Sequence, residues 1–93
     1  MNGSDLIAAE RRRQVDVEGY KDESDDVQND CELAEAAAAY ALRARDGERA
    51  GLVQYWPWNA HYWKPASPVR MLVKAGALIA AEIDRRLRAG ETP

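Results

Sequence analysis

The residues best suited to ligand chemistry lie in one short stretch, Tyr55–Pro65 (YWPWNAHYWKP), which holds five of the seven aromatic residues and the only histidine. Tyr and Trp rings each carry a polar atom, so they suit a wall that is apolar on one side and hydrogen-bonding on the other. A flat, anionic ligand such as a nucleotide could stack on these rings while nearby cations hold its phosphate. The ligand-binding residues predicted in this way are Trp56, Trp58, Tyr62, Trp63, Lys64, Arg70 and Lys74.

The same stretch has two other interpretations. Its rings would fill the volume that small core side chains leave, and Trp and Tyr are also residues that anchor protein interfaces. The lone His61 has no carboxylate or nucleophile beside it in a fixed motif, so we interpret it as a packed or interfacial residue. No catalytic residue is predicted, and the ligand is either a nucleotide-like small molecule or a protein.

Acidic residues between positions 20 and 35 offer a second chemistry, because carboxylate oxygens are ligands that Mg²⁺ and Ca²⁺ require. Glu32 and Glu35 are spaced i, i+3 on one predicted helix face, as in all-α nucleotide pyrophosphatases of the MazG type, which this feature resembles. Those enzymes add an ExxD pair, whereas the later helix has Glu82-Ile83-Asp84. A Mg²⁺-dependent hydrolase using Glu32, Glu35 and Glu82 is therefore an alternative. We prefer a solvated acidic loop and expect no cofactor.

Composition limits the remaining classes. A chain of 93 residues forms one domain, spanning 1–93, that can just sustain its own core. Its net charge of −3 argues against broad nucleic-acid binding, and no apolar run approaches the roughly 18 residues of a membrane span. The first residues lack the order of a signal peptide, so we expect a cytoplasmic protein. The single Cys31 cannot form an internal disulfide.

Helical patterns flank the aromatic stretch, and no strand-like alternation persists. An amphipathic helix over about 5–18 is capped by Ser4, with Leu6, Ala9, Arg13 and Val17 on one face. Its apolar face is small. We therefore expect this helix to lie across a helical pair rather than to build the core.

The predicted pair is antiparallel and comprises about 31–45 and about 68–89. Asn29 and Glu32 have the spacing of a capping box, and Ser67 followed by Pro68 opens the second helix. Because the first helix is rich in alanine, it needs a close neighbour to bury enough surface. Leu33, Ala37, Tyr40, Ala41 and Ala44 share a face of the first helix, and Leu72, Gly76, Ile79, Ile83 and Leu87 form one stripe of the second. The small residues Ala75, Gly76 and Ala80 are expected to face the alanine-rich helix, so that the two backbones approach closely. The fold is all-α, with an aromatic-rich connection.

Motifs along most of the chain resemble a family of small proteins from tailed phages and prophages. They are Glu10, Arg11 and Gln14 (ERRRQ), EGY at 18–20, DD at 25–26, ELA at 32–34 with Tyr40-Ala41, WPW at 56–58, WKP at 63–65 and LVKAGALIAAEI from Leu72. The resemblance implies a phage context, and hence the cytoplasm of an infected bacterial host, but no particular chemistry. Small accessory phage proteins commonly act by stoichiometric binding.

Three functional hypotheses follow. The first is binding of a nucleotide-like ligand through the aromatic and basic residues. The second is a protein-binding inhibitor or adaptor of a host protein, such as a defence protein, that uses the same surface. The third is the hydrolase. Alanine-rich helices and unevenly spread charge also predict a homo-oligomer.

Overall fold

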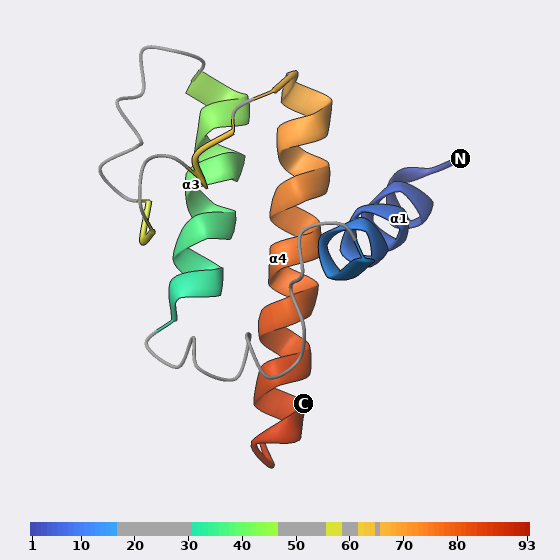
Figure 1. Cartoon of the computed structure of the whole chain (residues 1–93), viewed down its shortest axis with the longest axis vertical. Helices are drawn as coiled ribbons and strands as arrows, with labels where there is room; N and C mark the ends of the chain where they lie inside the picture. Colours follow the sequence, from blue (N-terminus) through green and yellow to red (C-terminus); the bar gives the residue numbers. More distant parts are fainter. Residues whose placement is uncertain (17–30, 47–55, 59–61, 65) are drawn as a thin grey trace.

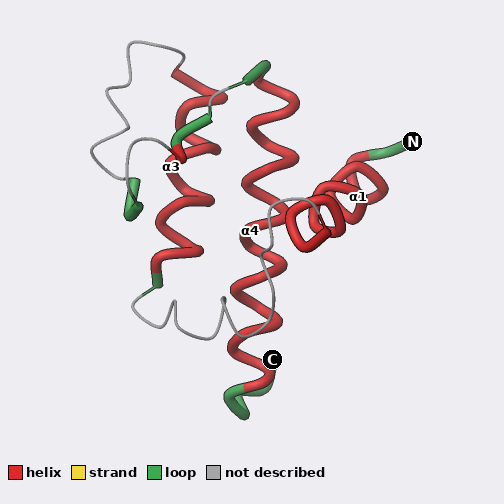
Figure 2. The backbone as a smooth tube through the Cα atoms, viewed as in Figure 1, coloured by secondary structure: helices red, strands yellow, loops and turns green. Residues whose placement is uncertain are grey.

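The computed structural model describes residues 1–16, 31–46, 56–58, 62–64 and 66–93. All regular structure among them is helical: α1 (Gly3–Asp16), α3 (Glu32–Asp46) and α4 (Pro68–Arg88), joined to short loops and turns (Figure 2). The helices α3 and α4 lie side by side and run in opposite directions, and α1 crosses α4 on the side away from α3 (Figure 1). The predicted all-α fold is confirmed.

The start of α1 differs from the prediction that Ser4 caps it. The helix begins at Gly3, and the Oδ1 atom of Asn2 accepts a hydrogen bond from the backbone N–H of Asp5 at 2.9 Å. In return, Asp5 Oδ2 accepts from the N–H of Asn2 at 3.1 Å. This reciprocal pair is a capping box, with Asp5 near the positive end of the helix dipole. It satisfies two backbone donors, so Ser4 is not needed as a cap.

The start of α4 agrees with the capping signal in the sequence. Ser67 is the N-cap, its side chain accepting from the N–H of Arg70 at 3.3 Å, and Pro68 follows at the first helical position. At the other end Gly90 has φ of 97°, a left-handed conformation that favours glycine. The N–H groups of Gly90 and Glu91 donate to the carbonyls of Leu87 and Arg86 at 3.0 Å each. These bonds form a Schellman motif, which closes the helix.

The main core lies between α3 and α4. The large side chains that α3 contributes are Leu33 and Tyr40, and both lie on the face predicted from the sequence. Trp56, from the aromatic connection, packs in the same cluster. Alanines on both helices allow the backbones to approach closely and gain dispersion contacts. The buried members are Leu33, Ala36, Ala37, Ala39, Tyr40, Trp56, Met71, Ala75, Leu78 and Ala81, with Ala41 and Ala44 packed against them. The predicted cap of this helix, Asn29, lies outside the described residues.

The prediction for the packing face of α4 is correct for Ala75, which is buried against α3, and wrong for the stripe that begins at Leu72. Ala80 lines a groove together with α1 residues. Leu72, Ile79, Ile83 and Leu87 are 48–53% exposed, and the face toward α3 is instead formed by the residues that precede them: Met71, Ala75, Leu78 and the paired Glu82. Because consecutive helical residues differ by about 100°, the helix is rotated by one residue from the prediction. Both stripes are apolar, but small Ala75 and flexible Met71 fit the alanine-rich α3 more closely.

The helix α1 packs on α4 rather than across both members of the pair. The Ile7 side chain lies over Gly76, where an added Cβ would come within 2.5 Å of Ile7 Cδ1, so the end of the Ile7 side chain would have to move if residue 76 carried a Cβ. The expectation that Ala9 belongs to the packing face is wrong, because Ala9 is exposed and Leu6 only half-buried. The buried residues of α1 are Glu10 and Gln14, and a polar packing face explains the weak amphipathic pattern. The predicted end near Val17 lies outside the described residues.

Candidate functional site

An aromatic cluster holds the connection against α3. The Tyr40 ring stacks on Trp63 with centroids 5.0 Å apart and planes at 11°, and it meets Trp56 edge-on, also at 5.0 Å. Trp56 in turn contacts Trp58 and Trp63 edge-on at 5.1 and 5.0 Å. Edge-to-face and offset-stacked pairs are the favoured geometries of aromatic rings. The cluster is therefore a structural unit, with Trp56 buried and Trp58 and Trp63 half-buried.

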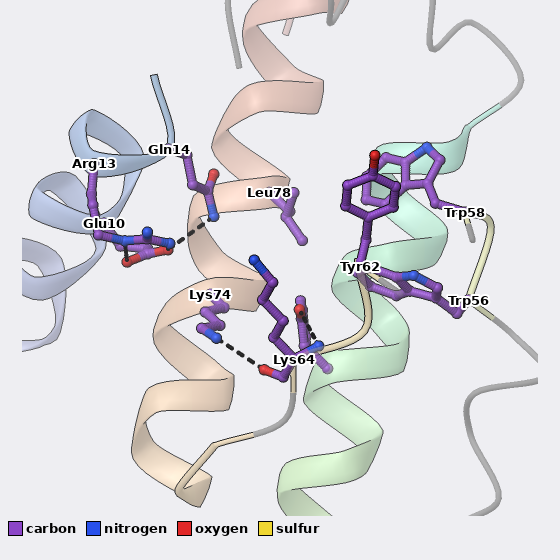
Figure 3. Close-up of a pocket in the computed structure, with 10 residues that line it drawn as sticks. Glu10, Arg13, Gln14, Trp56, Trp58, Tyr62, Lys64, Lys74 and Leu78 are labelled. Atoms are coloured by element: carbon purple, nitrogen blue, oxygen red, sulfur yellow. Dashed lines mark hydrogen bonds and ion pairs between the residues drawn. The ribbon is translucent and has the colours of Figure 1, made fainter. Parts of the chain in front are cut away.

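Two lysines are fixed beside this cluster. The Nζ atom of Lys74 on α4 donates to the carbonyl oxygen of Lys64 at 2.9 Å and lies 5.6 Å from the centre of the Tyr40 ring, a cation–π distance. The backbone N–H of Lys64 donates to the Tyr40 hydroxyl at 3.4 Å. These contacts place the exposed Lys64 side chain so that it reaches across a recess toward Gln14 (Figure 3). Tyr62, which is 54% exposed, lines this recess together with Lys64.

The aromatic cluster and the two lysines form one wall of the recess, and a polar network on α1 forms the other. The Glu10 side chain is fully buried and accepts hydrogen bonds from Arg13 Nε at 2.8 Å, Arg13 Nη2 at 2.7 Å and Gln14 Nε2 at 3.2 Å. The Nη2 atom of Arg70 on α4 lies 3.5 Å from Glu10 Oε1. The Oε1 atom of Gln14 is buried without a hydrogen-bond partner among the described residues. This carboxylate thus joins α1 to the start of α4.

Burial raises the pKa of the Glu10 carboxyl, but the hydrogen bonds and charge of Arg13 oppose this effect. Gln14 and Arg70 contribute in the same direction as Arg13, and the net result is a pKa below the ordinary value of 4.5. Glu10 is therefore ionised near neutral pH, with its charge offset by two guanidinium groups.

A small cavity lies between these two walls (Figure 3). Its volume is about 20 Å³, enough for one water-sized group. Small-molecule sites usually enclose roughly 300–1,000 Å³, so a nucleotide does not fit inside it in this conformation. The lining residues are Glu10, Arg13, Gln14, Tyr40, Trp56, Trp58, Tyr62, Lys64, Lys74 and Leu78.

Five of the seven predicted ligand-binding residues line this cavity. They are Trp56, Trp58, Tyr62, Lys64 and Lys74. The structure does not bring the other two into the lining: Trp63 is stacked on Tyr40, and Arg70 is paired with Glu10. His61 and Tyr55 lie outside the described residues.

Sequence reasoning missed the wall that α1 contributes. Glu10, Arg13 and Gln14 are spaced i, i+3 and i+4, which places all three side chains on neighbouring positions of one helix face. That spacing was a usable signal, although it gives no hint that the face turns inward. Tyr40 was predicted as a core residue, and its position is both in the core and in the cavity wall.

The carboxylates of the hydrolase hypothesis are placed differently. Glu82 on α4 accepts from Arg85 at 2.7 Å and from Arg86 at 3.0 Å, and the hydrogen bond from Arg85, opposed by burial, lowers its pKa. Glu32 and Glu35 lie in the first turn of α3. Across the described ranges, no group of three or more His, Cys, Asp or Glu side chains is arranged to hold a metal ion. The described geometry therefore adds no support for a metal site.

Comparison of the chain with protein-family models, with curated proteins and with solved structures found no match. Within the described part of the chain, the structure contains no helix with the length and apolar character that crossing a membrane requires. Any functional conclusion therefore rests on the site itself.

Proposed function

We propose that this protein acts by stoichiometric binding of a flat, anionic ligand of the nucleotide class at the aromatic and basic recess. The observation that supports this function is the meeting of four separate stretches at one place. Residues from α1, α3, the aromatic connection and α4 line one cavity that combines aromatic rings with the cations Lys64 and Lys74. Aromatic faces with adjacent cations suit a base and its phosphate.

The side chains that line the recess form two groups, which differ in their contacts and exposure. Tyr40, Trp56 and Lys74 are engaged with one another and form the floor. Tyr62 and Lys64 are exposed, and they form the mouth together with half-buried Trp58. Since the enclosed space holds only one water-sized group, the ligand rests on the mouth, with Tyr62 and Trp58 against its ring and Lys64 on its phosphate.

The buried carboxylate of Glu10 does not prevent anion binding. Its charge is offset by Arg13 at 2.7 Å and Arg70 at 3.5 Å, so the wall that faces Lys64 carries no uncompensated negative charge. The network instead holds α1 in place as one side of the recess.

A thermal-shift screen with tryptophan fluorescence tests this function, because all three tryptophans belong to the aromatic cluster. Nucleotides, including cyclic dinucleotides, are added with and without Mg²⁺. A ligand at 100 times its Kd stabilises the native state by about 2.7 kcal/mol, which raises the melting temperature by roughly 10–20 °C for a chain of this size. Lys64→Ala should weaken binding about tenfold or more, whereas Arg12→Ala, which removes an exposed cation of α1 outside the cavity lining, should not. Unchanged melting with every nucleotide would exclude the function.

The small cavity volume favours a second candidate, a protein partner that seats on the mouth without entering it. Exposed Tyr62 and half-buried Trp58 are residue types that anchor protein interfaces. In the phage context proposed for this chain, that partner would be a host protein such as a defence protein. Capture from host lysate by wild type but not by Trp58→Ala, with no nucleotide effect on melting, would favour this candidate over the first.

A further inference from the structure

The fully buried side chains of α1 are polar, whereas its large apolar side chains are only half-buried. Glu10 and Gln14 are 1% and 3% exposed, and Leu6, Ile7 and Val15 are half-buried. By contrast, α3 buries a leucine, a tyrosine and three alanines in the main core. The parts of a protein that open most easily are those with few buried apolar contacts. Of the three described helices, α1 is therefore the one held by the least buried apolar surface.

The ion pairs that join α1 to α4 are long and partly exposed. Arg70 Nη2 lies 3.5 Å from Glu10 Oε1, and Arg11 Nη2 lies 3.7 Å from Asp84 Oδ2. The side chains of Arg70 and Asp84 are 41% and 52% exposed, so water and salt screen the attraction. Pairs of this kind contribute little to stability.

The attached position of α1 also leaves a buried acceptor unsatisfied. Gln14 Nε2 donates to Glu10 Oε2 at 3.2 Å, which fixes the orientation of the amide group. The Oε1 atom on the other side of this amide is buried and has no hydrogen-bond partner among the described residues. Such an atom lowers stability, and water would satisfy it if α1 moved away from α4. Attachment of α1 thus carries a cost that detachment removes.

We propose that α1 is a movable wall of the recess, which detaches from α4 while α3 and α4 stay packed. Glu10, Arg13 and Gln14 of α1 line the cavity opposite the rings and lysines of the other wall (Figure 3). With α1 attached, the enclosed volume is about 20 Å³, far below the roughly 300 Å³ of a small-molecule site. Detachment exposes the cavity-lining faces of Tyr40 and Trp56, so that a flat ring can enter rather than rest on the mouth. Ring entry rests on the function proposed above, whereas detachment does not.

Native-state hydrogen exchange of the full chain tests detachment without any ligand. A detached helix of 14 residues is marginally stable in water, so its amides lose protection. We expect the amides of residues 7–16 to be protected at least about 100-fold less than those in the middle of α3 and α4. Equal protection of the three helices would overturn the proposal, whatever the nucleotides do.

Asp84→Asn weakens the attachment at an exposed position. It removes the ion pair with Arg11 and should speed exchange in α1 about two- to fivefold. The matched control is Glu91→Gln, which removes the exposed pair with Arg86 at the end of α4 and should leave exchange in α1 unchanged. An equal increase in α3 and α4 of Asp84→Asn would mean that the whole molecule opens at once, which would overturn the proposal.

A disulfide between α1 and α4 gives a test on one protein in two states. A Cβ at Gly76 would lie 2.8 Å from Ile7 Cγ1, which is one bond from Ile7 Cβ. The two Cβ atoms are therefore at most about 4.3 Å apart, a distance that a disulfide spans. The variant is Ile7→Cys/Gly76→Cys in a Cys31→Ser background, which removes the free cysteine. Circular dichroism checks that its helicity equals that of wild type in both states.

Oxidation should slow exchange in α1 to the rate in α4. It should also weaken binding of the nucleotides of the thermal-shift screen at least about tenfold, measured by titration of tryptophan fluorescence, and reduction should restore binding. Equal affinity of the oxidised and reduced proteins would overturn the movable wall while the proposed function stands. If no nucleotide binds the reduced protein, the proposed function fails, and the exchange rates still decide whether α1 detaches.

Discussion

At the scale of single residues, Glu10 combines full burial with full ionisation. Its folded pKa lies below the ordinary value, as does that of Glu82, so the unfolded chain binds more protons in acid. The stability that these carboxylates contribute is present above about pH 4.5 and is lost as pH falls through their folded pKa values.

Glu10→Gln tests this dependence. The neutral amide loses the charge-assisted bonds from Arg13, so we expect the free energy of unfolding at pH 7 to fall by about 1–3 kcal/mol. The difference from wild type should shrink as pH falls below about 4.5, because the unfolded chain then binds a proton that folded wild-type Glu10 takes up only at lower pH. Urea unfolding of both proteins at several pH values measures the loss at pH 7 and its change with pH. The same difference at pH 7 and pH 3 would mean that the carboxylate charge does not stabilise the fold.

Gly76 is a residue whose role depends on its neighbour. Alanine in a helix interior is about 1 kcal/mol more favourable than glycine, but here its Cβ would come within 2.8 Å of Ile7 Cγ1 as well as meeting Cδ1. Overpacking of this kind costs about 1–3 kcal/mol, so Gly76→Ala should destabilise wild type slightly.

In an Ile7→Ala background the same change should stabilise by about 1 kcal/mol, because the clash is removed. Urea unfolding of wild type, Gly76→Ala, Ile7→Ala and the double variant gives the coupling energy between the two residues. Equal effects of Gly76→Ala in both backgrounds would show that α1 does not pack on Gly76.

At the scale of elements, two serines with similar sequence signals have different roles. Ser67 caps α4, and its replacement by alanine should lower stability by about 1 kcal/mol. Ser4 is the matched control, because Asn2 and Asp5 already satisfy the start of α1. Ser4→Ala should change stability by less than about 0.5 kcal/mol. Thermal unfolding of both variants checks this order, and a larger loss for Ser4→Ala would contradict the capping box.

The helix α4 also shows why an amphipathic pattern alone was insufficient. Two stripes on it are apolar, one starting at Met71 and one at Leu72, and periodicity does not choose between them. The choice depends on the small side chains of α3 and on two arginines that pair with Glu82 at the end of the buried stripe.

At the scale of the whole molecule, the recess is built from four stretches of the chain that the fold brings together. Lys64→Glu should abolish the ligand-induced thermal shift, since Lys64 lies in the cavity wall. Ile79→Glu introduces the same charge at an exposed position of α4 outside the cavity lining, so it should leave the shift unchanged.

Thermal shift and circular dichroism on both variants check this expectation. Loss of the shift in both variants, with helicity equal to that of wild type, would contradict the placement of the ligand at the recess.

The sequence by itself determined the helices, the cap of α4 and the all-α class, because capping, helix propensity and turn residues act over a few neighbouring positions. It also marked Trp56, Trp58, Tyr62, Lys64 and Lys74 as one candidate site, since those residue types carry the chemistry wherever they lie. Only the tertiary structure decided which apolar stripe of α4 is buried and that the polar face of α1 completes the recess. Both depend on the fit between side chains distant in sequence, which local patterns do not contain.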